Sequence, residues 1–94
     1  MNPRMAQIAN LPPTHVQWII LDRMHVQDWT IHEYSSYVNL ADTSGARGRR
    51  RIQSRTFNAL LIRGWIELQY SGYPKIYGIT TEGRRMAKRA VPSG

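Results

Sequence analysis

The sequence predicts a single α+β domain in which three helices are followed by a two-stranded β-hairpin and a C-terminal helix. Three observations lead to this prediction. Apolar residues recur at helical spacing after Pro13, two short segments of alternating character flank a turn at residues 71–74, and the length of 94 residues suits one domain. A chain of this size buries a modest core, so most of its apolar residues must serve that core.

The first helix is expected to begin at Pro13 or Thr14 and to end near Met24 or His25. Proline suits the first turn of a helix. An apolar stripe follows at helical spacing, formed by Val16, Ile19, Ile20 and Met24. Residues 1–12 are expected to form a flexible arm and residues 92–94 a frayed tail, which leaves residues 13–91 as the folded domain.

A second helix is expected from Thr30 to about Asn39. Thr30 and Glu33 have the spacing of a capping box, in which the side chain of each residue accepts a hydrogen bond from the backbone N–H of the other. Trp29 and Tyr34 flank this cap at the positions of a hydrophobic staple. Residues 40–48 then have the composition of a loop.

The third helix is expected to begin between Ser44 and Arg49 and to end at Arg63, with Gly64 taking the left-handed position that often follows a helix. Residues 65–70 and 75–79 form the two strands of the hairpin. Thr80 caps a last helix that continues to about Val91. The order of these elements is that of a winged helix-turn-helix, with the hairpin as the wing.

The charge of the chain favours a nucleic-acid partner. Thirteen Lys and Arg residues oppose six Asp and Glu residues, for a net charge of +7, and eleven of the thirteen are arginine. Arginine presents a planar fork that suits phosphates and guanine edges. Residues 47–63 contain six arginines and no acidic residue, whereas a merely solvated helix usually interleaves charges of both signs.

On a helix that begins before Arg47, one face is polar and cationic, because successive residues are ~100° apart. That face carries Arg47, Arg51, Ser54, Arg55 and Asn58. Arg51, Arg55 and Asn58 are expected to contact base edges in the major groove, and Ser54 a base or a phosphate.

Further contacts are expected on both sides of this helix. Arg47, Arg49 and Arg50 suit phosphates, and Tyr73 and Lys75 at the tip of the wing suit phosphate or sugar. These contacts would position the protein on the duplex, whereas the contacts of the third helix would read its sequence.

Two segments resemble the winged-helix transcription regulators of bacteria, archaea and their viruses, a broad group that includes MarR-like and PadR-like repressors. Residues 60–67 (LLIRGWIE) resemble the family's leucine, glycine and aliphatic pair before the wing, and residues 79–83 (ITTEG) its strand that opens the next helix. The resemblance covers about Pro13 to Val91. It implies a third-helix recognition surface and a wing carried by Tyr73 and Lys75.

The chain departs from this family in two respects. Its loop before the third helix is longer than the family norm, and it lacks the long extra helices with which many of these regulators dimerise. Dimerisation and ligand sensing therefore stay open. Trp18 is interpreted either as a residue at the edge of the core or as a dimer contact.

No pattern in the sequence predicts an enzyme, a cofactor or a metal site. The three histidines lack metal-ligand spacing, and there is no cysteine and no glycine-rich phosphate loop. No apolar run approaches the ~18 residues of a membrane helix, and residues 1–11 lack the apolar region of a signal peptide. We expect a cytoplasmic protein, nucleoid-associated when bound to DNA, with no membrane partner and no small-molecule ligand.

The predicted function is sequence-specific binding of double-stranded DNA by a small transcriptional regulator, acting as a monomer or a homodimer. One alternative is an architectural protein that binds DNA or RNA without regard to sequence. Another is a protein–protein adaptor, which would have no need of the arginines at positions 51 and 55.

Overall fold

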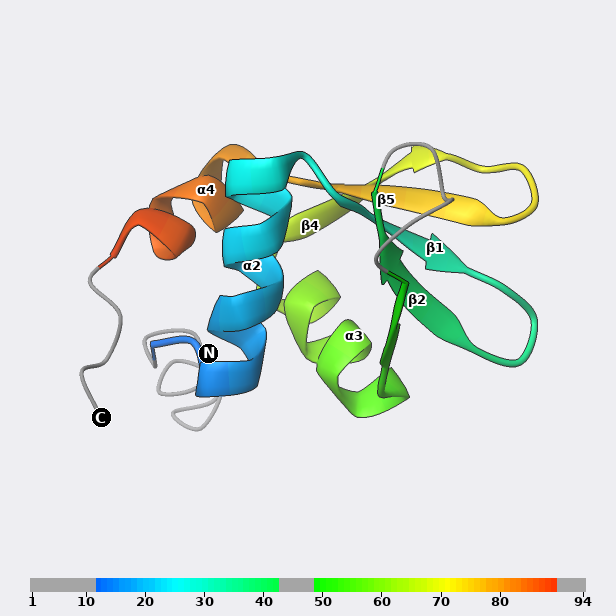
Figure 1. The fold of residues 1–94 in the computed structure, drawn as a ribbon, viewed down its shortest axis with the longest axis horizontal. Helices are drawn as coiled ribbons and strands as arrows, with labels where there is room; N and C mark the ends of the chain where they lie inside the picture. The colour runs from blue at the N-terminus through cyan, green and yellow to red at the C-terminus, as the bar shows by residue number, and fades with distance from the viewer. Residues whose placement is uncertain (1–11, 43–48, 90–94) are drawn as a thin grey trace, which may run out of the picture.

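A five-stranded antiparallel sheet with helices packed on one face forms the body of the protein (Figure 1). The computed structural model describes residues 12–42 and 49–89. In chain order the elements are α2 (His15–Gln27), β1 (Thr30–Glu33), β2 (Val38–Ala41), β3 (Arg50–Ile52), α3 (Ser54–Ile62), β4 (Ile66–Tyr70), β5 (Lys75–Ile79) and α4 (Thr81–Lys88). The strand order across the sheet is β3-β2-β1-β5-β4.

Helix α2 confirms the first predicted helix. Thr14 and Gln17 form a reciprocal capping box, with the Gln17 N–H donating to Thr14 Oγ1 at 3.2 Å and the Thr14 N–H donating to Gln17 Oε1 at 3.0 Å. The helix ends at Asp28, which is left-handed with φ 57°. Its inner face buries Ile20, Leu21 and Met24.

The predicted second helix is wrong, because residues 30–41 form the hairpin of β1 and β2. Their register pairs Thr30 with Ala41 and Glu33 with Val38. The expected cap is also wrong: Thr30 Oγ1 is hydrogen-bonded to His32 Nε2 at 2.8 Å, and Glu33 accepts a hydrogen bond from Tyr77. The physical reason is that β1 pairs with β2 on one side and with β5 on the other. Backbone groups of β1 therefore find hydrogen-bond partners in the sheet, and a local helix cap would satisfy fewer of them.

The predicted third helix starts later than expected. Residues 50–52 are strand β3, which pairs Leu40 with Arg50 and Val38 with Ile52. Helix α3 begins only at Ser54, and Gln53 at its N-cap makes no side-chain capping bond. The end of the helix is as predicted, since Gly64 has φ 72° in the turn that leads to β4. Residues 50–52 form a strand because the buried Ile52 pairs with Val38, its buried neighbour on β2.

The hairpin and the last helix are confirmed. Strands β4 and β5 pair from Ile66 and Ile79 outward, with an irregularity near Gln69. Thr80 caps α4 by accepting a hydrogen bond from the Gly83 N–H at 3.0 Å. The predicted fold class, a winged helix-turn-helix with a two-stranded wing, is nevertheless wrong, because the described residues contain three helices and five strands in one sheet.

The core lies between this sheet and the helices. The helices contribute Ile20, Leu21, Met24, Phe57, Leu60, Met86 and Ala87. The sheet contributes Ile31, Val38, Leu40, Ile52, Ile66, Tyr77 and Ile79. Because side chains alternate along a strand, the residues between these buried positions point to the opposite face of the sheet.

Helix α4 packs closely against the end of the loop that precedes β4. A methyl group at Gly83 would overlap the Trp65 carbonyl oxygen and lie 2.7 Å from Ile79 Cγ1. The Thr80 N–H donates to the same Trp65 carbonyl at 2.9 Å, which fixes α4 at this place.

We therefore expect Gly83→Ala to lower the free energy of unfolding by about 1–3 kcal/mol, the usual cost of overpacking. The loss would occur although alanine favours a helix over glycine by up to ~1 kcal/mol. Urea unfolding followed by circular dichroism measures it, with the exposed Thr81→Ala on the same turn as control. A midpoint of Gly83→Ala equal to or above that of the wild type would contradict the packing described.

Candidate nucleic-acid interface

One row of side chains crosses the open face of the sheet, the face opposite the helices. Arg51 of β3 is in register with Asn39 of β2, and Asn39 with His32 of β1. His32 is in register with Ile76 of β5, and Ile76 with Tyr70 of β4. Each of the first four is adjacent in sequence to a buried core residue, so alternation places the row on the open face. Four strand spacings of ~4.8 Å give the row a length of roughly 19 Å.

A cluster of three tyrosines lies at one end of this face. The rings of Tyr34 and Tyr37 stack with centroids 4.7 Å apart and an interplanar angle of 24°. Tyr73 meets Tyr34 edge-on at 5.8 Å. The first two belong to the β1–β2 turn and the third to the β4–β5 turn, and these two turns lie side by side at the right of Figure 1. We call Tyr34, Tyr37 and Tyr73 the tyrosine cluster.

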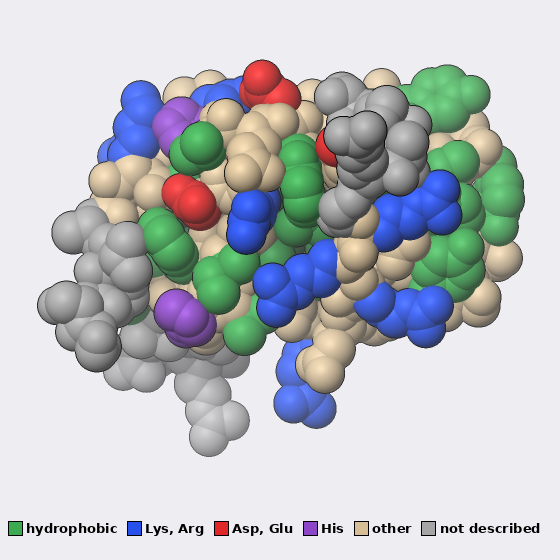
Figure 2. All heavy atoms as spheres, in the orientation of Figure 1, with side chains coloured by type: hydrophobic (Ala, Val, Ile, Leu, Met, Phe, Trp, Pro, Cys, Tyr) green, Lys and Arg blue, Asp and Glu red, His purple; other side chains and the backbone are tan. Residues whose placement is uncertain are grey.

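An arginine extends the tyrosine cluster toward β3. The Arg51 guanidinium carbon lies 4.8 Å from the centroid of the Tyr37 ring, within the range of a cation–π contact. Tyr73 is 70% exposed, and its hydroxyl lies 3.2 Å from Ser35 Oγ. Figure 2 shows hydrophobic side chains, a class that includes tyrosine, gathered over the hairpin ends with Lys and Arg side chains beside them. The surface combines flat rings with cationic groups.

A shallow hollow of about 280 Å³ adjoins the tyrosine cluster. Its walls include His32, Tyr34, Asn39 and Arg49. Burial and, second, the positive charge of Arg49 lower the pKa of His32, while Asp42 acts in the opposite direction. The imidazole is therefore neutral at neutral pH and presents hydrogen-bonding nitrogen to the hollow without adding a charge.

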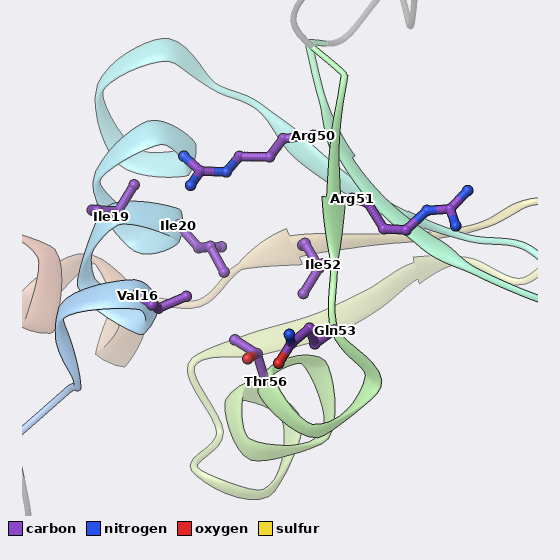
Figure 3. Close-up of a pocket in the computed structure, with 8 residues that line it drawn as sticks. All are labelled: Val16, Ile19, Ile20, Arg50, Arg51, Ile52, Gln53 and Thr56. Carbon is purple, nitrogen blue, oxygen red and sulfur yellow. The ribbon is translucent and has the colours of Figure 1, made fainter.

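The structure separates the predicted DNA-contacting residues into different surfaces. Arg49, Arg51 and Tyr73 border the open face. Arg50 points from β3 toward α2 instead (Figure 3). Lys75 is exposed on the helix side of β5 opposite Glu33, and Arg47 lies outside the described residues.

Three of the predicted residues remain together on α3. Ser54, Arg55 and Asn58 are all exposed there. The predicted continuous stripe from Arg47 to Asn58 is wrong, because a strand and a helix have different side-chain periods.

Four residues of the open face were missed by the sequence analysis: His32, Tyr34, Tyr37 and Asn39. They were assigned to a helix, in which Tyr34 had only a stapling role. The alternation of Ile31, Val38 and Leu40 with polar or aromatic neighbours is the signal that indicates strands here.

Trp18 lies at the edge of the core. Its indole N–H donates to the Ala87 carbonyl oxygen at 3.3 Å, and the side chain is half-buried between α2 and α4. This contact satisfies the indole within the chain, so Trp18 supplies no argument for a dimer.

Residues 12–42 and 49–89 contain no group of three or more His, Asp or Glu side chains that could hold a metal ion. None of the helices in these ranges has the length and apolar character needed to cross a membrane.

Comparisons with protein-family models, curated proteins and solved structures gave no match to this chain.

Tyr77 and Glu33 connect β5 to the end of β1. The Tyr77 hydroxyl donates to Glu33 Oε1 at 2.7 Å. Burial, this hydrogen bond and the negative charge of Glu33 raise the pKa of Tyr77 to about 12. Between pH 10 and 12 the unfolded tyrosine loses its proton while the folded one keeps it, so stability falls as pH rises.

We expect the contribution of Tyr77 to be fully present below pH 10 and to be lost as pH rises through about 12. Tyr77→Phe should flatten the dependence of the unfolding free energy on pH in that window. Urea unfolding at several pH values measures the slope, with Tyr70→Phe, an exposed tyrosine, as control. Identical slopes for Tyr77→Phe and the wild type would refute the raised pKa of Tyr77.

Proposed function

We propose that this protein binds nucleic acid, and that it binds a single strand on the open face of its sheet. The observation that carries the proposal is the tyrosine cluster with the Arg51 guanidinium placed on the Tyr37 ring. Aromatic rings on which bases stack, together with a cationic path for the backbone, are the usual components of single-strand sites.

The arrangement of the face supports this proposal in two ways. The exposed Tyr73 ring and the hairpin turns offer stacking surface at one end, and Arg51 and Arg49 lie along β3 and its entry. The row from Arg51 to Tyr70 adds amide and imidazole groups between them, which can bond base edges. The net charge of +7 attracts a polyanion over a longer range.

A single strand suits this face better than a duplex. Stacking on a tyrosine requires an unpaired base whose ring is accessible, and the bases of a duplex are already stacked on each other. An open sheet face also differs from the single helix or narrow ribbon that enters a major groove.

Double-stranded DNA is the second candidate, and α3 is the surface that favours it. Ser54, Arg55 and Asn58 are exposed on one short helix, and arginine and asparagine pair with guanine and adenine edges. A transcriptional regulator with a cytoplasmic, nucleoid-associated location belongs to this candidate. An adaptor could also use exposed tyrosines and arginines, which are common at protein interfaces, but it would not bind a single strand with the salt dependence expected for a polyanion.

Two variants separate stacking from charge at the open face. We expect Tyr73→Ala, which removes the most exposed ring of the tyrosine cluster, to weaken binding of a labelled single strand of about 12 nucleotides by roughly 5- to 150-fold, the effect of losing one stacked base. Arg51→Gln should weaken it too and should reduce the slope of log K against log salt by about 0.7, the value for one phosphate contact on a single strand. Fluorescence anisotropy over a salt series measures both quantities.

The matched control is Tyr73→Phe, which keeps the ring and should retain most of the affinity. The proposal fails if Tyr73→Ala, shown to be folded by circular dichroism, binds the single strand as tightly as Tyr73→Phe does.

The two candidates are distinguished on the other surface. We expect Arg55→Gln/Asn58→Ala to leave single-strand affinity nearly unchanged, because α3 lies on the opposite side of the sheet from the tyrosine cluster. Selection from random duplexes at roughly 0.2 M salt removes most non-specific binding. A recovered duplex motif whose binding is lost in the α3 variant would establish the second candidate in place of the first.

A further inference from the structure

A groove separates α2 from the junction of β3 and α3 on the helix side of the sheet. Its volume is about 250 Å³. Figure 3 shows Val16 and Ile20 of α2 facing Ile52 of β3 across it. Val16 is 54% exposed although it faces this groove, so the space is an apolar surface that no described side chain fills.

One end of the groove is cationic. Arg50 and Arg51 are both among the residues that line the groove, but Arg50 extends from β3 toward α2, whereas the side chain of Arg51 points away from α2 (Figure 3). The side chain of Arg50 makes no hydrogen bond or ion pair with residues 12–42 or 49–89, in contrast to that of Arg51, which lies on Tyr37. With respect to those residues, its guanidinium donors remain available at the mouth of an apolar groove.

The other end of the groove carries neutral polar groups. Gln53 and Thr56 lie together at the start of α3 and line this end (Figure 3). Gln53 is the N-cap residue of α3, yet its exposed side chain makes no capping bond, and no hydrogen bond joins its side-chain amide to another described residue. The groove thus presents a cation, an apolar middle and hydrogen-bonding groups, in that order.

We propose that this groove binds a small carboxylic acid with an apolar body, such as an aryl or branched alkyl monocarboxylate. Arg50 would hold the carboxylate through its fork, a geometry that matches two oxygens. Val16, Ile20 and Ile52 would contact the apolar body, and Gln53 or Thr56 would bond a polar substituent at its far end.

The size of the groove limits the ligand. Sites for drug-sized molecules measure ~300–1,000 Å³, so a groove of about 250 Å³ suits a smaller molecule. Charge complementarity selects an acid, because Arg50 is the one ionisable group with its charged end at this groove among the residues that line it. This site does not depend on the nucleic-acid proposal, since the two lie on opposite faces of β3.

Benzoate is the probe that tests the site in the full chain. We expect millimolar benzoate to shift the methyl NMR signals of Val16, Ile20 and Ile52 saturably and to raise the melting temperature, since a ligand that binds the folded state stabilises it. At equal ionic strength, acetate, which lacks the apolar body, and benzyl alcohol, which lacks the charge, should each bind at least 10-fold more weakly.

The neighbouring arginines provide a matched pair of variants. Arg50→Gln should weaken benzoate binding at least 10-fold, whereas Arg51→Gln, with the same loss of net charge, should leave it unchanged. Equal effects of the two variants, or equal binding of benzoate and benzyl alcohol, would overturn the proposal. Loss of single-strand binding in Arg51→Gln with benzoate binding intact would confirm that the two sites are separate.

Discussion

The antiparallel pairing of β1 with β5 is the constraint on which the rest of the structure depends. It joins the β1–β2 hairpin to the β4–β5 hairpin and thereby makes one sheet from two local units. A two-stranded hairpin alone is marginally stable in water, whereas a larger sheet with a helix-covered face supports itself. Ile31, which is completely buried in the central strand β1, occupies the place where the two hairpins and the helices meet.

The same pairing determines where the tyrosines lie. Because β1 and β5 are antiparallel, the end of β1 is opposite the beginning of β5, as the register of Glu33 with Lys75 shows. The turn that leaves β1 and the turn that enters β5 must then emerge at the same end of the sheet. Tyr34 and Tyr73, which are far apart in sequence, meet there for this reason. The pairing of β1 with β5 thus brings the tyrosines of the candidate interface together, and no additional helix or strand is required.

The parts of the fold that could be predicted from the sequence are those with local signals. Helix α2 has an apolar stripe and a proline before it, the β4–β5 hairpin has its own turn, and α4 has the Thr80 cap. Residues 30–41 could not be assigned in this way, since Thr30 and Glu33 fit a helix cap as well as they fit a strand. The apolar alternation along residues 31–40 is compatible with strands but covers few residues, and it is the pairing with β5, more than 40 residues away, that decides between helix and strand.

Only part of the candidate site could be predicted, because an arginine-rich segment fits the side-chain period of a helix as well as that of a strand. Arg51 was expected to contact nucleic acid and borders the proposed interface, but its neighbours on the predicted helix face do not accompany it. With the 3.6-residue period of a helix, Arg51 and Arg55 share a face, whereas the period of two in a strand gives Arg51 the side opposite Arg50 and Ile52. Tyr34 and Tyr37 were not predicted as site residues for the same reason, since their positions depend on the strand period of β1 and β2, which flank their turn.

The alternation along β3 also resolves an electrostatic difficulty. Adjacent arginines with no acidic residue between positions 47 and 63 would repel one another if they shared a surface. The strand directs Arg50 to the groove beside α2 and Arg51 to the Tyr37 ring, so that the sheet itself separates their charges. The Tyr37 ring stabilises the Arg51 cation directly, whereas the Arg50 guanidinium has no acidic partner among residues 12–42 and 49–89. A short edge strand with two arginines is also a poor template for pairing with a second sheet, because charged edge residues disfavour such pairing. Strand β3 can therefore carry a binding group on each face while leaving the sheet closed to further strands at this edge.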